Sequence, residues 1–313
     1  MPNAEPFGPE MAPVPGSASQ MPPQVQFKTS GKAIGPASVA QFETKLVTLP
    51  EKLGPKQEGP IAAKGKGDSN AFSPNDINQG SIGDCYFLAS LAAIAHTNPG
   101  ILRKAINQNS DGTFTVKLYI DKESRFLFWK TKKLVPVDVK LYPTFPVSVD
   151  GSDAANPDAS ANPAHAHGGD TDEKGRTELW VRLIEKAYAL INGSYKAIGN
   201  GGFAADALET LTGERYTEKV LDDDSKERIV EMVKEGIPVT VSTNKDKFKS
   251  LSKADKKFAD ENSIVGGHAY TVLAADNSTI KIRNPWGSGA RNATPEITWA
   301  QFKTYFNQFS DKD

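Results

Sequence analysis

Cys85, the only cysteine among 313 residues, is the side chain with the clearest potential for chemistry. It follows the glycine-containing stretch 79–84 and starts an apolar run whose residues from Leu88 to Ala95 recur at three- and four-residue spacing, which predicts a buried helix of about three turns. Backbone N–H groups in a first helical turn have no intrahelical partner, and the helix dipole favours negative charge there. The pattern therefore predicts a thiolate at Cys85, the nucleophilic form. The alternative is a buried cysteine that acts only as a small hydrophobe.

Two distant stretches supply partners for such a nucleophile. His268 begins the apolar strand in GGHAYTVLAA, and Asn284 ends the next strand in IKIRNPWG. A cysteine, a histidine and an asparagine separated by long intervals can meet only in the fold, as a papain-like nucleophile requires. The amide oxygen of Asn284 can accept a bond from one imidazole nitrogen, so that the other nitrogen faces Cys85. Taken alone, a histidine in an apolar strand is more often a packed core residue.

The chain resembles the calpain family of cysteine proteases in four blocks that occur in the family's order. The blocks are the segment through QGSIGDCYFLASLAAIA, the segment ELWVRLIEKAYALINGSYKAIGNGG, the His268 strand and the NPWG turn. The resemblance implies an α+β fold of papain-like, two-lobed architecture. A helical lobe would carry Cys85, and an antiparallel β lobe would carry His268 and Asn284. It also implies a cysteine-type endopeptidase that hydrolyses protein or peptide substrates.

The resemblance implies roles for two further side chains. The side-chain amide of Gln79, six residues before Cys85, would join the backbone N–H of Cys85 in an oxyanion hole, because attack on a peptide carbonyl builds negative charge on its oxygen. Trp286 would shield the hydrogen bond between His268 and Asn284 from water. Without the resemblance, a glutamine in a turn is ordinarily a solvated residue.

A calcium site beside the nucleophile is also implied. Calpain cores bind calcium there through an aspartate nine residues before the cysteine, a carboxylate at the start of the next long helix and backbone carbonyls; here these positions hold Asp76 and Glu178. Hard oxygen ligands suit Ca²⁺, so one calcium ion is a candidate cofactor, although the reaction itself requires none. A glutamate at a helix start is also common simply because it complements the dipole.

Two other metal sites have little support in the sequence. The family's second calcium site uses acidic residues shortly after NPWG, where this chain has SGARNA, residues 288–293, without a carboxylate. We therefore predict weak calcium dependence or none. The pair His165 and His167 lies in a polar low-complexity stretch, and such a pair alone is an unspecific metal signal.

Composition divides the chain into three predicted parts. Residues 1–60, rich in Pro, Gly and Ser, are expected to form a flexible arm, either a plain linker or a partner-binding or inhibitory segment. Residues 61–213 are expected to form the N-terminal lobe, interrupted by a low-complexity insert at 149–176 that we interpret as a mobile surface loop. Residues 214–313 are expected to form the C-terminal β lobe.

Hydrophobic patterning predicts the elements around these sites. Alternating segments at 113–120 and 124–131 predict a hairpin with its turn at 121–123, and residues 179–191 predict a helix with one wide apolar face. The charged stretch 244–263 is expected to be a solvated loop or surface helix. Residues 296–309 are expected to form a strand followed by an aromatic-faced helix.

Charge and cysteine content exclude several classes of protein. A net charge of −1 gives no argument for binding nucleic acid or acidic membranes, and a single cysteine cannot form an intramolecular disulfide. The first residues lack the basic start and apolar core of a secretory signal, and no apolar run reaches the length of a membrane span. We therefore expect a monomer that meets protein or peptide substrates and is cytoplasmic or exported without a cleaved signal.

Two other functions use the same residues. A papain-like acyltransferase would pass the acyl group to an amine and produce cross-linked protein. A catalytically silent binding protein on a protease scaffold is the alternative outside enzymes, although all the catalytic residues are present.

Overall fold

The computed structural model describes residues 49, 53–126, 129–146 and 165–313. In this part the chain has a mixed α+β fold with antiparallel sheets, and its buried apolar residues form two clusters. The first cluster lies in residues up to Tyr216, which we call the N-terminal half, together with Ala269. The second lies in residues 229–309, in the C-terminal half. Among the described residues, no helix is both long enough and apolar enough to cross a membrane.

The N-terminal half contains the following elements: η1 (Pro74–Asp76), α1 (Cys85–Thr97), α2 (Pro99–Ala105), β1 (Ile106–Gln108), β2 (Phe114–Phe126), β3 (Trp129–Leu141), α3 (Trp180–Ile191), α4 (Tyr195–Ile198) and α5 (Ala204–Thr212). The strands form an antiparallel sheet in the order β1-β2-β3. Helix α1 is buried on all sides from Tyr86 to Ala95, because its residues there are apolar apart from Ser90, whose hydroxyl bonds back to the carbonyl of Tyr86. The predicted helical lobe therefore also contains a sheet.

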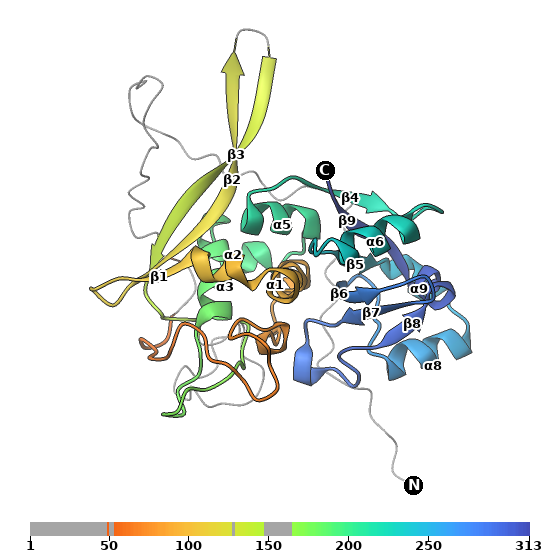
Figure 1. The fold of residues 1–313 in the computed structure, drawn as a ribbon, viewed down its shortest axis with the longest axis horizontal. Coiled ribbons are helices and arrows are strands. Elements are labelled where there is room, and N and C mark those ends of the chain that lie inside the picture. Colours follow the sequence, from red (N-terminus) through yellow and green to blue (C-terminus); the bar gives the residue numbers. More distant parts are fainter. Residues whose placement is uncertain (1–48, 50–52, 127–128, 147–164) are drawn as a thin grey trace.

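The hairpin of β2 and β3 is longer than predicted, and its turn lies elsewhere. The polar residues 121–123 belong to β2, and the strands pair without a break from Phe114 opposite Leu141 to Phe126 opposite Trp129. The polar run suggested a turn, but the register is set by the apolar residues of both strands that share one buried face. The distal end projects beyond the rest of the molecule (Figure 1). Pro136 is tolerated because β3 is an edge strand.

The C-terminal half contains the following elements: β4 (Tyr216–Val220), α6 (Ser225–Lys234), β5 (Thr240–Thr243), α7 (Lys245–Lys249), α8 (Lys253–Glu261), β6 (Ala269–Ala275), β7 (Thr279–Arg283), η2 (Gly287–Gly289), β8 (Glu296–Thr298), α9 (Trp299–Tyr305) and β9 (Phe306–Lys312). Its strands form an antiparallel sheet in the order β4-β9-β5-β6-β7-β8. The charged stretch 244–263 folds mainly as α7 and α8, in keeping with the predicted surface helix.

The chain end differs from the prediction. The helix expected to run to residue 309 ends at Tyr305, and the chain continues as β9, between β4 and β5. Phe306 and Phe309 are buried in this strand. In so short a segment the positions of the aromatic residues fit the period of a helix as well as that of a strand. Pairing with the distant strands β4 and β5 favours the strand.

Parts of the predicted arm and insert are packed against the body. Most of the arm, 1–48 and 50–52, lies outside the described residues, but Gly54 N–H donates to the carbonyl of Phe145 at 2.8 Å. Of the insert, 147–164 lies outside the described residues. The rest is not wholly a surface loop, because Ala166 is fully buried and its N–H donates to the carboxylate of Glu185.

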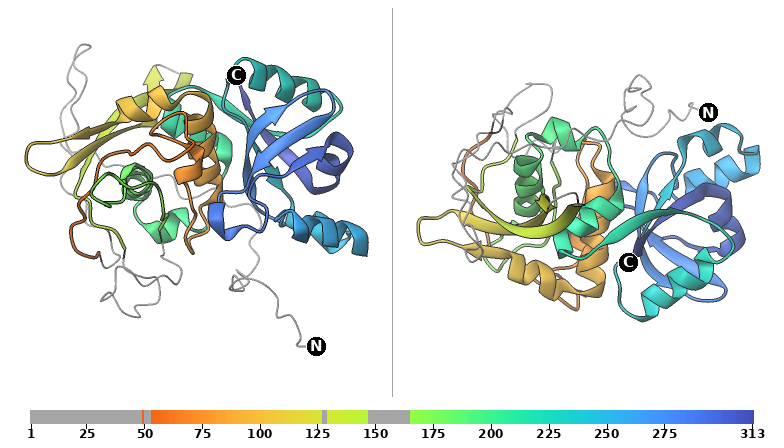
Figure 2. Two further views of the ribbon diagram at one scale, coloured as in Figure 1. Left: turned by 60° about the horizontal axis from the view of Figure 1, so that its bottom comes forward. Right: turned by 90° about the horizontal axis from the view of Figure 1, so that it is seen from above.

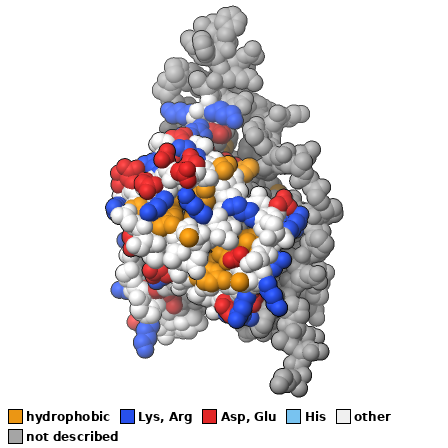
Figure 3. Space-filling model, turned by 90° about the vertical axis from the view of Figure 1, so that its right-hand side faces the viewer, with side chains coloured by type: hydrophobic (Ala, Val, Ile, Leu, Met, Phe, Trp, Pro, Cys, Tyr) orange, Lys and Arg blue, Asp and Glu red, His pale blue; other side chains and the backbone are white. Residues whose placement is uncertain are grey.

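The two halves meet where α1 lies against β6. Thr271 Oγ1 donates to the carbonyl of Ala89 at 2.6 Å, and the His96 ring lies 2.7 Å from the carbonyl of Leu273. The views in Figure 2 agree that α1 lies between the N-terminal sheet and the C-terminal strands. The outer face of the C-terminal half carries positive and negative side chains interspersed with small apolar patches (Figure 3), in keeping with the near-zero net charge.

Candidate active site

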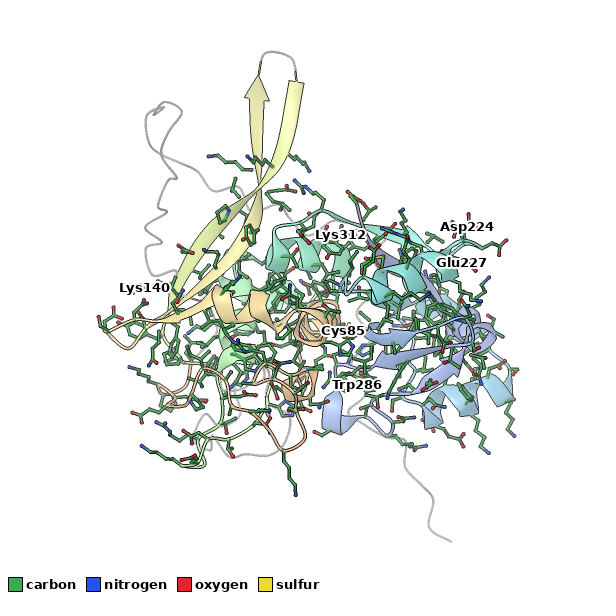
Figure 4. All side chains as sticks on the ribbon, viewed as in Figure 1. Cys85, Lys140, Asp224, Glu227, Trp286 and Lys312 are labelled. Carbon is green, nitrogen blue, oxygen red and sulfur yellow. The ribbon has the colours of Figure 1, made fainter. Side chains whose placement is uncertain are left out.

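Cys85 is the first residue of α1, as the sequence predicts, and lies at the border between the two halves (Figure 4). Asp84 is the N-cap residue, and its carbonyl accepts the N–H groups of Phe87 and Leu88. The turn before the helix needs Gly83, since a Cβ there would lie 2.6 Å from the carbonyl oxygen of Gly199. The residue as a whole is partly exposed, but its sulfur is buried and interacts with the backbone of Ala269, the first residue of β6.

The predicted thiolate is not the resting form of Cys85. The pKa of the thiol is raised to about 11, chiefly by burial of the sulfur; the backbone of Ala269 opposes this shift and the charge of Asp84 adds to it. The helix N-terminus favours the thiolate, as expected, but the second half covers the site and desolvation outweighs the dipole. Cys85 is therefore a neutral thiol in this arrangement.

His268 and Asn284 are brought together by adjacent strands. His268 directly precedes β6 and Asn284 follows β7, with Thr271 paired opposite Arg283. His268 Nε2 lies 3.0 Å from Asn284 Oδ1, and both side chains are buried. Burial lowers the pKa of His268 to about 4, although the bond to Asn284 opposes this shift. The imidazole is therefore neutral at physiological pH.

The hydrogen bonds of Asn284 determine the tautomer of His268. Asn284 Nδ2 donates to the carbonyl of Ser263 at 2.9 Å, and Oδ1 accepts the backbone N–H of Trp286 at 2.9 Å. The amide orientation is thereby fixed, so Nε2 of His268 must carry the proton and donate to Oδ1. Nδ1 is left with a free lone pair, as a general base requires. No hydrogen bond joins this ring to the Cys85 thiol in the described structure; the neighbouring Ala269 makes the contact.

Trp286 lies beside this pair. Its ring centre is 4.9 Å from that of His268, at an angle of 46°, and the ring of Tyr270 contacts His268 edge-on from a centre also 4.9 Å away. Two aromatic rings therefore hold the imidazole in place. Figure 4 shows Trp286 at the border, below Cys85.

Gln79 is buried in the turn before Cys85. Its Nε2 donates to the carbonyl of Ile82 at 2.7 Å, and its backbone N–H donates to the carbonyl of Pro285 at 2.9 Å. One amide hydrogen of Nε2 remains for another acceptor. Gln79 Oε1 is buried without a hydrogen-bond partner.

Two carboxyl groups behind Cys85 escaped sequence reasoning. Asp84 and Glu185 are both fully buried and interact with each other, and Glu185 also accepts the N–H of Ala166. Burial, together with the neighbouring charge for Glu185, raises the pKa of both groups, that of Asp84 to about 7. The pair therefore shares a proton at neutral pH, which limits the negative charge beside the thiol. The only sign of this carboxyl pair in the sequence is that Asp84 directly precedes Cys85.

Ser263 was also missed, because it lies at the end of a charged surface stretch. Its carbonyl accepts Asn284 Nδ2 and the hydroxyl of Tyr270, and its Oγ accepts the backbone N–H of Arg291. Ser263 adopts a positive φ of 50°, a strained conformation for a residue other than glycine. Ser263, in the segment after α8, thus orients the side-chain amide of Asn284, and this amide in turn orients His268.

An acidic cluster lies about Asp76. Carboxylate oxygens of Asp68, Asp76 and Asp170 lie within 4.8 Å of one another. The resemblance paired Glu178 with Asp76, and the two side chains interact here, while the two oxygens of Glu178 also accept the N–H groups of Ala63 and Asp170 at 2.8 and 3.1 Å. Glu178 is near enough to repel the Asp76 carboxylate, yet lies outside the cluster of three.

The electrostatics of this cluster favour a cation. Burial, followed by the charge of Glu178, raises the pKa of Asp76 to about 8, and burial raises that of Glu178 to about 7. Arg283 is the nearby positive group, with its own pKa lowered to about 10 by burial. Three carboxylate ligands suit a hard divalent cation, and its binding would displace protons. The residues present therefore fit calcium.

The titration of the thiol gives a direct check on the resting state. Because the thiol pKa is about 11, the thiolate fraction, and with it the rate of alkylation by iodoacetamide, should rise about tenfold per pH unit from pH 7 to pH 10. Mass spectrometry follows the reaction cleanly because the chain has one cysteine. The chain in denaturant is the control, with a midpoint near 8.5. A rate already at its plateau at pH 7 would show a preformed ion pair with His268 instead.

Comparisons with known proteins cover most of the described chain. A family model described as "Calpain family cysteine protease" matches residues 61–305. Mouse calpain-9 is 27% identical over 245 residues, covering 74% of this chain and 31% of that protein. The Arabidopsis thaliana calpain-type cysteine protease DEK1 is 30% identical over 244 residues, 74% of this chain and 9% of that protein. The bovine calpain-2 catalytic subunit is 28% identical over 271 residues, which cover 76% of this chain and 34% of that protein. The chain thus spans about a third or less of these relatives.

Proposed function

Because the chain belongs to the calpain family of cysteine proteases, we propose that it is a papain-like cysteine endopeptidase with the triad Cys85, His268 and Asn284. Two lobes, 61–213 and 214–313, would bind a peptide between them; the two hydrophobic clusters support this division, although Tyr216 and Ala269 belong to the first cluster. The observation that carries the proposal is the hydrogen bond of 3.0 Å between His268 Nε2 and Asn284 Oδ1, which leaves Nδ1 of His268 free to act as a base. The next residue, Ala269, contacts Cys85 through its backbone.

The proposed reaction begins from a neutral thiol and a neutral imidazole. Nδ1 of His268 takes the thiol proton as the sulfur of Cys85 attacks the peptide carbonyl, and the Nε2 proton stays on the bond to Asn284. The imidazolium then protonates the leaving amine as the C–N bond breaks, which leaves an acyl-enzyme. His268 next takes a proton from water as the water oxygen attacks the thioester carbonyl. The imidazolium then returns this proton to the sulfur as the C–S bond breaks, which releases the acid and the thiol.

Gln79 would stabilise the oxyanion in both steps. One hydrogen of its Nε2 is bonded to Ile82, which holds the amide in place, and the other would point to the substrate oxygen together with the N–H of Cys85. Preplaced donors of this kind need no reorganisation, and the loss of one costs on the order of 3 kcal/mol of transition-state stabilisation.

Two assays on the same sample test the function. An unfolded protein such as casein is expected to be cleaved, and an epoxide-type peptide inhibitor is expected to label Cys85 with one equivalent. Hydrolysis would produce new N-termini, whereas an acyltransferase would produce cross-linked bands. Absence of both reactions and of labelling would identify the chain as a binding protein on a protease scaffold.

Calcium is expected to bind the cluster of Asp68, Asp76 and Asp170. The ion would supply positive charge that offsets the repulsion between these buried carboxylates. At ten to a hundred times its Kd, calcium should raise the free energy of unfolding by about 1 to 3 kcal/mol. Thermal or urea unfolding with calcium, with magnesium and with chelator measures this effect.

Matched variants locate the ion. Asp170→Asn should abolish most of the stabilisation by calcium, whereas Asp172→Asn should not, because Asp172 pairs with Arg176 outside the cluster. An equal response of both variants, or no response of the unmodified chain, would contradict this site.

A further inference from the structure

Three consecutive residues before the nucleophile helix are bonded to the loop that carries Asn284 and Trp286. Four hydrogen bonds cross between the halves here: Arg283 Nη2 to the carbonyl of Ile77 (2.6 Å), Ser288 N–H to Asn78 Oδ1 (2.8 Å), Ser288 Oγ to Asn78 Oδ1 (3.1 Å) and Gln79 N–H to the carbonyl of Pro285 (2.9 Å). We call residues 77–79 with 283–288 the clasp. The clasp uses protein groups alone.

Asn78 is the side chain at the centre of the clasp. It is 8% exposed and fits between two glycines, one from each half. A Cβ at Gly287 would lie 2.1 Å from Asn78 Oδ1, and a Cβ at Gly168 would lie 2.5 Å from Asn78 Nδ2; both glycines have positive φ, 56° and 79°. Its carbonyl also accepts the N–H of His167 at 2.9 Å. Any side chain at Gly168 or Gly287 would therefore displace the side-chain amide of Asn78.

The clasp lies directly between the two sets of catalytic groups. Gln79, the proposed oxyanion donor, follows Asn78 on one side, and Asn284 and Trp286 lie within the loop on the other. A displacement of about 1 Å in such groups can cost 100-fold in rate. Asn78 is buried whereas Ser288 is exposed, so the costly loss at this seam would be that of the partner of Asn78 Oδ1, and the bonded arrangement is preferred.

We propose that Asn78 is a positioning residue that holds the His268–Asn284 loop in register with Gln79 and Cys85, so that the active site is assembled without a bound ion. This inference rests on the proposed function and adds its regulation. The acidic cluster begins two residues away at Asp76 and lines one pocket with Asn78, Arg283 and Ser288, but the four bonds of the clasp join protein groups directly.

Steady-state kinetics on the full chain test the inference. Asn78→Ala should lower kcat by about 10- to 100-fold, because both bonds to Ser288 are lost, while KM changes by less than about threefold. Asn78→Asp, which keeps an oxygen acceptor, should recover most of the activity. Asn109→Ala is the matched control, since it removes asparagine bonds to Thr113 and Thr115 far from the seam. The unmodified chain should retain its kcat in chelator.

Hydrogen exchange tests the clasp independently of activity. In Asn78→Ala the amides of Gln79 and Ser288 should exchange at least about tenfold faster, with α1 and β6 unchanged. Gly287→Ala should reproduce both effects, since its Cβ would lie 2.1 Å from Asn78 Oδ1 and displace that side chain. The combined loss in the double variant should be smaller than the sum of the two single losses.

The possible failures are distinguishable. Unchanged kcat and unchanged exchange in Asn78→Ala, or activity that disappears in chelator and returns with calcium, would overturn the clasp. An unmodified chain that cleaves nothing would overturn the proposed function, while the exchange result would still decide whether the clasp exists. If Asn78→Ala does not fold, Gly287→Ala and Asn78→Asp decide the question.

Discussion

Replacement of Cys85 by alanine is expected to reduce peptide hydrolysis by at least about 10³-fold, to the background of the assay. The variant removes the atom that forms the acyl-enzyme, and no other cysteine in the chain can replace it. The oxyanion donors and the binding surface remain, so a small residual rate is expected. Initial rates on a fluorogenic peptide and on casein measure the loss.

The fold should survive this change. Cys85 is partly exposed and alanine is a better helix former, so the unfolding midpoint should fall little or rise. Cys85→Ser is the companion variant, isosteric and equally inactive, because a hydroxyl is a much poorer nucleophile. Cleavage by the alanine variant at the original rate would rule out the covalent mechanism.

Replacement of His268 by alanine is expected to reduce kcat/KM by at least about 10³-fold as well. No base would then take the thiol proton, and at a thiol pKa of about 11 almost no thiolate forms at pH 7. Added imidazole should restore part of the rate, since it can enter the space beside Trp286. His268→Gln, which fills that space with a polar group that is not a base, should be inactive and should not respond to imidazole.

The pH profile of the unmodified enzyme checks the same role. Burial depresses the pKa of His268 to about 4, so the neutral base persists as pH falls and is lost only near pH 4. The acidic limb of kcat/KM should therefore lie near pH 4 in the range where the protein stays folded. An acidic limb near pH 6.5, or His268→Ala activity within tenfold of the original, would contradict this assignment.

Several elements of the site follow from local sequence. Apolar spacing predicted a helix from Cys85, and the structure has α1 at Cys85–Thr97. Apolar segments predicted two consecutive strands with His268 at the start of one and Asn284 at the end of the next, and these are β6 and β7. These signals are readable because the periods of helix and strand depend on neighbouring residues.

Other features depend on segments far apart in the chain. The hairpin turn was misplaced because cross-strand packing, and not the polar run at 121–123, sets the register. Strand β9 was missed because its place between β4 and β5 comes from pairing with distant strands. Asn78, Ser263 and the carboxyl pair of Asp84 and Glu185 carry no local signal of their roles.

The amino-acid sequence by itself determined the family resemblance, the position of the candidate nucleophile Cys85 at the start of a helix, and the placement of its two proposed partners on consecutive strands. Only the tertiary structure decided that Cys85 rests as a neutral thiol, that Asp68 and Asp170 join Asp76, and that Asn78 links the halves. The reason is physical: hydrophobic periodicity depends on residues that are close in sequence, so it predicts local helices and strands. Desolvation, clustering of charges and hydrogen bonds between the halves depend on which distant segments pack together in the fold.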